Sequence, residues 1–227
     1  MELRNQQCET PEKRSDCFKQ TIYLVRHGET DANKDGIYQG RSVDNPLNDT
    51  GRTQAELLGK FLKDFQNYFP SPGIIYSSSS LRALETAAII EYSIFKSHPL
   101  LFISVPDLQE INHGLWEGKR HEQISKEYPF IYNLWQTNPM AVRFPGGETA
   151  VEANERVISA WKKIMEFQNG HILIVGHVVT NLFILCHALK NPKMIRGVRQ
   201  HNACLNVLEK QGDIFKDILL NSTLHLT

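Results

Sequence analysis

Short apolar runs alternate along this chain with longer segments in which apolar residues recur every three or four positions. The short runs, several of which end in polar or turn-forming residues, predict buried strands at residues 21–25, 74–76, 101–105, 171–175 and 203–208. The periodic segments predict helices at residues 50–69, 81–90, 149–168 and 178–185. Strands that alternate with helices indicate an α/β fold with buried parallel strands.

The segments outside these elements are polar or contain glycine and proline. Residues 1–20 are polar and aperiodic, so we expect a flexible arm there. Residues 31–49 predict a loop. The pattern of the tail from Gln211 does not decide whether it forms a final hairpin strand. The first predicted helix carries an apolar stripe that we expect to be core, formed by Ala55, Leu58, Leu62, Phe65 and Phe69.

Length and charge narrow the function. The chain has 227 residues, 41% of them hydrophobic, so residues 21–227 can form one domain around one core. Lys and Arg together number 25, and so do Asp and Glu. This balance provides no overall field that would attract nucleic acid or an anionic membrane, and we expect neither as a partner. Any cationic site must therefore be local.

The cysteines and the chain start indicate a compartment. The four cysteines show no metal-type spacing, and Cys186 and Cys204 lie in apolar segments. The first residues lack the apolar stretch of a signal peptide, and no later apolar run approaches the roughly 20 residues that span a bilayer. We expect a soluble, cytoplasmic protein with a reduced set of thiols and no bound metal.

The end of the first predicted strand carries candidate chemistry in Arg26, His27 and Gly28. Arginine offers a rigid fork of donors for phosphate oxygens, neutral histidine offers a nucleophilic nitrogen, and glycine lets backbone N–H groups approach an anion. The three residue types indicate a phosphate site that contains a nucleophile. The alternative is a strand end with two satisfied polar residues.

Complementary residues recur downstream. Gly176 and His177 follow the apolar run at 171–175, which repeats the arrangement at His27, and two such histidines can meet across a parallel sheet. Arg82 falls in the first turn of a helix, where a positive charge opposes the helix dipole and calls for a compensating partner. An anion bound at the helix N-terminus would be such a partner, and a surface salt bridge is the alternative.

Further candidate residues lie in segments that connect the predicted strands and helices. Glu110 lies just past the strand at 101–105 and is our candidate proton donor to a leaving group, with Asp107 and His113 as rivals. In the loop at 31–49, the candidates for ligand binding are Asn33, Gln39 and Gly40. Glu148 is explained as a first-turn acid of the helix that begins near Thr149.

Aromatic residues gather between positions 116 and 140. They predict either packing or an apolar lid over the site, and they are Trp116, Tyr128, Phe130, Tyr132 and Trp135.

The motifs together resemble the histidine phosphatase superfamily, whose members share the phosphoglycerate mutase-like fold. The resemblance covers residues 21–208 and rests on the run Arg26 to Thr30, Pro46-Leu47 with Gly51 and Gln54-Ala55, the serines before Arg82 with Thr86-Ala87, Glu110 before Gly114 to Gly118, Gly146 to Glu148, and Gly176-His177. The family often has glycine after the second histidine, whereas Val178, Val179 and Thr180 follow it here. This departure concerns the substrate pocket, in which Thr180 is a candidate.

The resemblance implies a three-layer α/β/α sandwich with a mostly parallel central sheet. It implies that His27 becomes phosphorylated, that Arg26, Arg82 and His177 surround the phosphate, and that Glu110 acts as acid and base. Such a mechanism requires His27 to be neutral at the attacking nitrogen and favours a protonated His177. It requires no cofactor.

Three functions fit these residues. We favour a phosphomonoesterase acting on a small phosphorylated metabolite, because Glu110 and the segment from Trp116 to Lys119 resemble the phosphatase branch of the family. A phosphoglycerate mutase dependent on 2,3-bisphosphoglycerate ranks second, and a catalytically silent binding protein ranks third. The sequence does not decide which phosphate ester is the substrate or whether the protein forms a homodimer.

Overall fold

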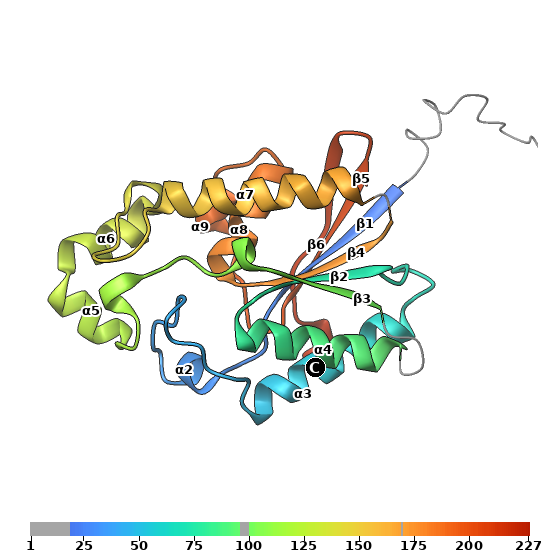
Figure 1. Ribbon diagram of the computed structural model, residues 1–227, viewed down its shortest axis with the longest axis horizontal. Helices are drawn as coiled ribbons and strands as arrows, with labels where there is room; N and C mark the ends of the chain where they lie inside the picture. Colours follow the sequence, from blue (N-terminus) through green and yellow to red (C-terminus); the bar gives the residue numbers. More distant parts are fainter. Residues whose placement is uncertain (1–18, 96–99, 169) are drawn as a thin grey trace, which may run out of the picture.

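The computed structural model describes residues 19–95, 100–168 and 170–227, in which six strands form one sheet (Figure 1). The strand order is β3-β2-β4-β1-β5-β6. β1, β2, β3 and β4 pair in parallel, whereas β5 runs antiparallel to β1 and β6 antiparallel to β5. The strands are β1 (Lys19–Arg26), β2 (Ile74–Ser78), β3 (Leu101–Val105), β4 (Ile172–Gly176), β5 (Leu205–Gln211) and β6 (Ile214–Ser222).

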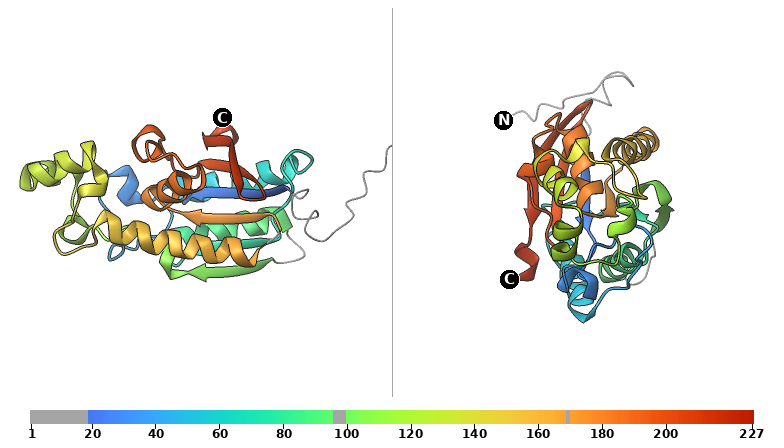
Figure 2. Two further views of the ribbon diagram at one scale, coloured as in Figure 1. Left: turned by 90° about the horizontal axis from the view of Figure 1, so that it is seen from above. Right: turned by 90° about the vertical axis from the view of Figure 1, so that its left-hand side faces the viewer.

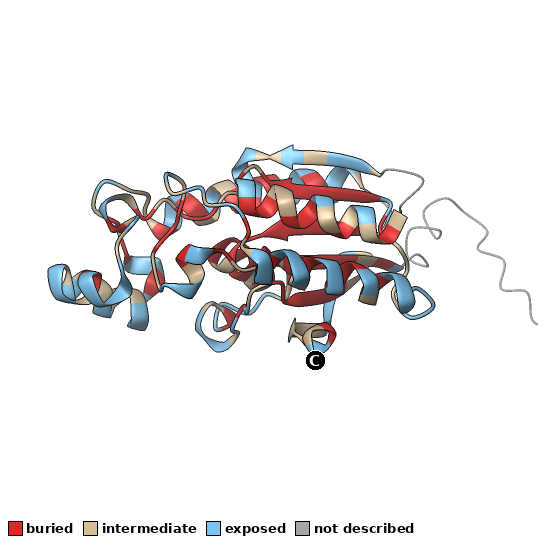
Figure 3. Cartoon of the chain, turned by 90° about the horizontal axis from the view of Figure 1, so that it is seen from below, coloured by how far each residue is buried: buried red, intermediate tan, exposed pale blue. Residues whose placement is uncertain are grey.

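Helices cover both faces of this sheet, as the alternation of side chains along a strand requires. Ile22 and Leu24 of β1 pack in one cluster with α7 (Ala150–Phe167) and α8 (Val178–Ala188). Tyr23 and Val25 pack in a second cluster with α3 (Asp49–Asp64) and α4 (Leu81–Phe95). Buried residues accordingly line the sheet and the inner helix faces, while the outer faces are exposed (Figure 3). The predicted three-layer α/β/α fold is confirmed.

The carboxyl ends of the parallel strands point toward α5 (His121–Glu127) and α6 (Pro129–Thr137), which extend beyond the sheet at one end of the molecule (Figures 1 and 2). The short helix α2 (Asp31–Lys34) lies at the same end, and α9 (Met194–Gly197) follows α8. Within the described residues, no helix is both long enough and apolar enough to cross a bilayer.

Several element boundaries differ from the sequence predictions. The expected arm at 1–20 falls largely outside the described residues, but Lys19 and Gln20 belong to β1 because they pair with Gln211 and Lys210 of β5. The expected loop at 31–49 contains α2, which begins at a capping box formed by Thr30 and Asn33. The sequence left undecided whether the tail forms a hairpin strand, and the structure shows that it does, as β6.

Two helix predictions are also corrected. α3 ends at Asp64, so Phe65 becomes its C-cap and is 43% exposed instead of joining the core stripe. α7 begins after the N-cap Thr149, and its first-turn acid is Glu152, whose side chain accepts the Thr149 N–H. Glu148 precedes the N-cap, and its carboxylate has other partners that are described below.

Candidate active site

The site forms where β1 and β4 end side by side. Arg26, the last residue of β1, is in register with Gly176, the last residue of β4. The next residues are therefore His27 and His177, and their ring centroids lie 5.1 Å apart. Both histidines are buried. The parallel register thus brings together two side chains that are 150 positions apart in the sequence.

The hydrogen bonding of His27 selects one ring nitrogen for chemistry. Nδ1 lies 2.7 Å from the carbonyl oxygen of Gly28, which can only accept, so Nδ1 carries the proton. Nε2 is then the unprotonated nitrogen with a free lone pair. Burial is the main cause that lowers the pKa of His27 well below 6.5, and the neighbouring Arg82 and Arg26 lower it further. The ring of His27 is accordingly neutral at neutral pH.

Gly28 allows the strand end to pack tightly against α3 and α4. A Cβ added there would lie 2.5 Å from the carbonyl oxygen of Gly51 in the first turn of α3. The Gly28 N–H donates to Oγ1 of Thr86 on α4 at 3.0 Å. A larger residue would push these backbones apart and move His27 with them.

Two guanidinium groups reach the histidines. Arg82 is 1% exposed, and its Nη2 donates to the Gly40 carbonyl at 2.9 Å. Nη1 of Arg26 donates to the Gln200 carbonyl at 2.7 Å. In each case Nε is buried without a hydrogen-bond partner among the described residues, as is Nδ1 of His177. Buried polar atoms of this kind need partners, and the oxygens of a phosphate would provide them.

Arg82 has the compensating partner that its place in a helix first turn requires. Asp44 accepts the Leu81 N–H at 2.8 Å, which caps α4, and its carboxylate also lies 3.4 Å from Nη1 of Arg82. The serines that precede α4, Ser77 to Ser80, do not receive this N–H. Instead Oγ of Ser78 lies 2.8 Å from Nε2 of His177 and orients that ring.

Glu110 is held at the N-terminus of α8, next to His177. Its carboxylate accepts the N–H groups of Val179 at 3.1 Å and Thr180 at 3.3 Å. Burial raises the pKa of Glu110, although hydrogen bonds from the N–H groups of Val179 and Ile111 and the charges of Arg82 and Arg26 act in the opposite direction. A buried carboxyl whose pKa is raised beside a neutral nucleophile is suited to proton transfer.

The expectation of a protonated His177 is not met. Burial lowers its pKa well below 6.5, and the positive charge of Arg82 lowers it further. The negative charge of a phosphate dianion placed between these groups would raise the pKa of His177 and so oppose the effect of the arginines.

One cavity of about 370 Å³ connects these groups. His27, His177, Arg26, Arg82 and Glu110 line it, and so do the predicted substrate residues Asn33, Gln39 and Gly40. The predicted Thr180 does not line it, because its hydroxyl donates to the Gln109 carbonyl and its N–H to Glu110. Its neighbours Val178 and Val179 face the cavity instead, since successive residues of α8 point in different directions.

The rival proton donors are placed differently. Asp107 is exposed and does not line the cavity. His113 does line it, but burial lowers its pKa to about 3, so at neutral pH its ring is neutral and lacks the acidic proton of an imidazolium. Glu110 therefore has the best position of the three.

Part of the cavity wall was not predicted from the sequence. Asn202 links the segment after β1 to the loop that carries Asn33. Its Nδ2 donates to the carbonyl of Gly28 at 3.2 Å and to Oδ1 of Asn33 at 3.0 Å. Tyr38, His121 and Gln136 line the far side together with Trp135, which was considered only as packing or lid. No local pattern marks these residues, which come from separate segments.

A cluster of charged residues supports the loops around the site. Glu117 accepts the N–H groups of Arg41, Ser42 and His113, and the side chain of Ser42 also donates to it. Gly40 must be glycine, because its φ is +64° and a Cβ would collide with the Glu117 carboxylate. Glu117 thereby fixes the turn whose Gly40 carbonyl binds Arg82.

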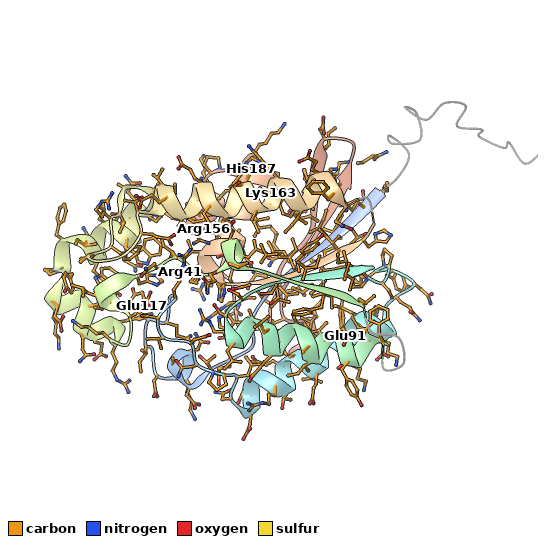
Figure 4. The ribbon with its side chains drawn as sticks, viewed as in Figure 1. Arg41, Glu91, Glu117, Arg156, Lys163 and His187 are labelled. Carbon is orange, nitrogen blue, oxygen red and sulfur yellow. The ribbon has the colours of Figure 1, made fainter. Side chains whose placement is uncertain are left out.

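A second acid in this cluster holds the segment that carries Glu110. Glu148 accepts from Nε and Nη2 of Arg156, both at 3.1 Å, and pairs with Arg41 at 3.1 Å. Arg156 also donates to the carbonyls of Asp107 and Gln109. Figure 4 shows Arg41, Glu117 and Arg156 near the green segment that follows β3. The role of Glu148 is thus an ion-pair network, not the predicted helix-dipole acid.

Among the described residues, no three His, Cys, Asp or Glu side chains are grouped as a metal ion would require.

Comparisons with known proteins agree with this geometry. A family model described as histidine phosphatase superfamily (branch 1) matches residues 22–223. "Uncharacterized phosphatase PhoE" of Bacillus subtilis is 32% identical over 89% of this chain and 96% of its own length, and "Phosphoserine phosphatase 1" of Hydrogenobacter thermophilus is 31% identical over 74% and 75%. The crystal structure of an alpha-ribazole phosphatase from Shigella flexneri superposes with a TM-score of 0.76, at 26% identity, over 89% of this chain and 96% of that one.

Proposed function

Because this chain belongs to the histidine phosphatase superfamily and is a hydrolase of the phosphatase type, we propose that it cleaves a small phosphate monoester through a phosphohistidine intermediate on His27. The observation that carries the proposal is the hydrogen bond from Nδ1 of His27 to the Gly28 carbonyl. It leaves Nε2 with a lone pair in the cavity that Arg26, Arg82 and His177 also line.

In the first step, Nε2 of His27 attacks phosphorus while the bond from phosphorus to the ester oxygen breaks. Arg26, Arg82 and His177 stabilise the negative charge on the three transferring oxygens. Glu110 gives its proton to the departing oxygen, so the product leaves as a neutral alcohol. The negative charge of the Glu110 carboxylate that remains is stabilised by the N-terminus of α8.

In the second step, a water molecule attacks phosphohistidine. The Glu110 carboxylate takes one proton from this water, the bond between phosphorus and Nε2 breaks, and inorganic phosphate leaves. The carboxyl of Glu110 and the neutral ring of His27 are then restored. The proposal includes no cofactor and no metal ion in either step.

The intermediate can be tested directly. Mixing the protein with a phosphate ester and quenching within milliseconds should yield acid-labile, base-stable phosphate on His27, identified by mass spectrometry. His27→Ala should abolish both the label and phosphate release, while circular dichroism confirms folding. Label only on a serine or on His177 would contradict the proposal.

Two further controls test the reaction class. Phosphate release should persist in a metal chelator and without 2,3-bisphosphoglycerate. Loss of hydrolysis on chelation would reveal a metal requirement. Rapid interconversion of 3- and 2-phosphoglycerate that depends on the bisphosphate, with little phosphate release, would instead identify a mutase.

A further inference from the structure

The charges of the cavity are confined to one end. Its permanently positive lining residues, Arg26 and Arg82, lie at the strand ends with Glu110. The opposite side, which we call the distal wall, is formed by Ile37, Tyr38, His113, His121, Trp135 and Gln136. Within the described residues, no lysine or further arginine lines the cavity.

The distal wall is uncharged and rich in aromatic rings. The rings of Tyr38 and His121 lie with centroids 4.3 Å apart and planes tilted by 35°, and His113 packs edge-on against Trp135 at 6.2 Å. Burial lowers the pKa values of His113 and His121, so both rings are neutral at pH 7. The wall therefore offers ring faces and neutral donors or acceptors, but no counter-charge.

Three arginines outside the cavity lining have partners of their own. Arg41 is paired with Glu148 at 3.1 Å, and Arg120 donates to the Asp35 carbonyl at 2.7 Å. Arg196 lines an adjacent groove that shares Trp135 and Gln136 with the cavity, and its Nη1 donates to the Thr137 carbonyl at 2.9 Å. Arg196 is exposed and does not line the cavity itself.

On the basis of the proposed function, we propose that the substrate is a phosphate monoester whose leaving group carries no charge and presents a flat or apolar surface to the distal wall. A second phosphate or a carboxylate would lose water there without gaining a cation, which is costly. An aromatic or sugar-like group would instead bury apolar surface against Tyr38 and Trp135.

Two matched pairs of esters test the two parts of this proposal. Glycerol 3-phosphate and 3-phosphoglycerate differ in a neutral hydroxymethyl against a carboxylate, and we expect kcat/KM to be roughly 10- to 100-fold higher for glycerol 3-phosphate. Benzyl phosphate and ethyl phosphate differ in a ring, and we expect roughly a 10-fold preference for benzyl phosphate. Equal or inverted preferences would overturn the proposal.

Variants locate the cause of each preference. Trp135→Ala should reduce the ratio of benzyl to ethyl phosphate turnover by several-fold. Gln136→Lys should narrow the gap between 3-phosphoglycerate and glycerol 3-phosphate, because it adds the missing cation. Arg196→Gln should leave this gap as it is, like the surface control Lys163→Gln. If 3-phosphoglycerate is turned over well in the original chain and loses this turnover in Arg196→Gln, the groove carries a second anion site and the proposal fails.

The outcome remains separable from the proposed function. Hydrolysis of all four esters with labelled His27, but without the two preferences, would refute only the leaving-group proposal. Failure to hydrolyse any ester and absence of phosphohistidine would refute the phosphatase mechanism itself.

Discussion

The two ends of the cavity are built in different ways. The phosphate end takes His27 and His177 from the ends of two adjacent central strands, and their backbones are fixed by the sheet register. The distal wall takes Tyr38 from a loop, His121 from α5 and Trp135 from α6, beyond the edge of the sheet. A rigid end with fixed positive charges suits a group that every substrate shares, whereas an end formed by helices outside the sheet can differ between substrates without disturbing the chemistry.

The largest expected effect tests the phosphate end through Glu110. Glu110→Gln keeps the size of the side chain but removes the proton that the leaving group needs. We expect hydrolysis of ethyl phosphate to slow by roughly 10²- to 10⁴-fold, the usual scale for a lost general acid. Nitrophenyl phosphate should slow much less, because nitrophenolate leaves without a proton. Rapid-quench measurement of phosphohistidine formation compares the two.

An equal loss for both esters would show that Glu110 only positions other groups, and His113→Gln and Asp107→Asn would then be assayed for a selective loss.

The pH dependence of the reaction provides a check in the original chain. Burial raises the pKa of Glu110, and only its protonated form donates. The rate ratio of ethyl to nitrophenyl phosphate should therefore fall as pH rises through that pKa, and in Glu110→Gln the ratio should no longer depend on it.

A smaller effect is expected at Glu117, which supports the phosphate end without lining the cavity. Glu117→Gln replaces an acceptor of several N–H groups by a side chain that also donates, so the turn that holds Gly40 and Arg82 should shift. We expect kcat/KM to fall roughly 10-fold for benzyl and ethyl phosphate alike. Glu155→Gln, on the exposed side of α7, is the matched control.

A loss confined to benzyl phosphate would instead place the influence of Glu117 on the distal wall. A loss in kcat with KM unchanged would assign it to transition-state positioning through Arg82. Equal loss in the matched control would contradict a specific role.

The smallest expected effect concerns His113, which belongs to the distal wall. Its pKa in the folded chain is about 3, against an ordinary value of 6.5, so the unfolded chain binds a proton that the folded chain does not. The stabilising contribution is complete above pH 6.5 and is lost progressively as pH falls toward 3. Between pH 7 and 5.5 this loss amounts to roughly 1 kcal/mol.

Urea unfolding at pH 7 and pH 5.5 measures this loss of stability. In His113→Gln the free energy of unfolding should decline by roughly 1 kcal/mol less over this interval than in the original chain, although His27 and His177 contribute in the same direction in both proteins. An unchanged decline would mean that His113 is already accessible to protons in the folded state.

The sequence by itself determined much of the phosphate end. Apolar runs of strand length that end in Arg26-His27 and in Gly176-His177 place both histidines at one sheet edge, because parallel strands end on the same side. The helices follow from local periodicity in the same way, and so does the assignment of Arg82 to a first turn that needs a compensating partner. These inferences depend on residues that are neighbours in the chain.

Only the tertiary structure decided which groups complete the site. Glu110 is distinguished from Asp107 by the N–H groups of Val179 and Thr180, which lie about 70 positions away in the sequence. Glu148 could not be recognised as the partner of Arg41 and Arg156, because the spacing of residues along one helix predicts neither contact. The distal wall joins separate segments for the same physical reason. Side-chain packing between distant elements depends on the shape of the whole core, and no local pattern of polar and apolar residues records it.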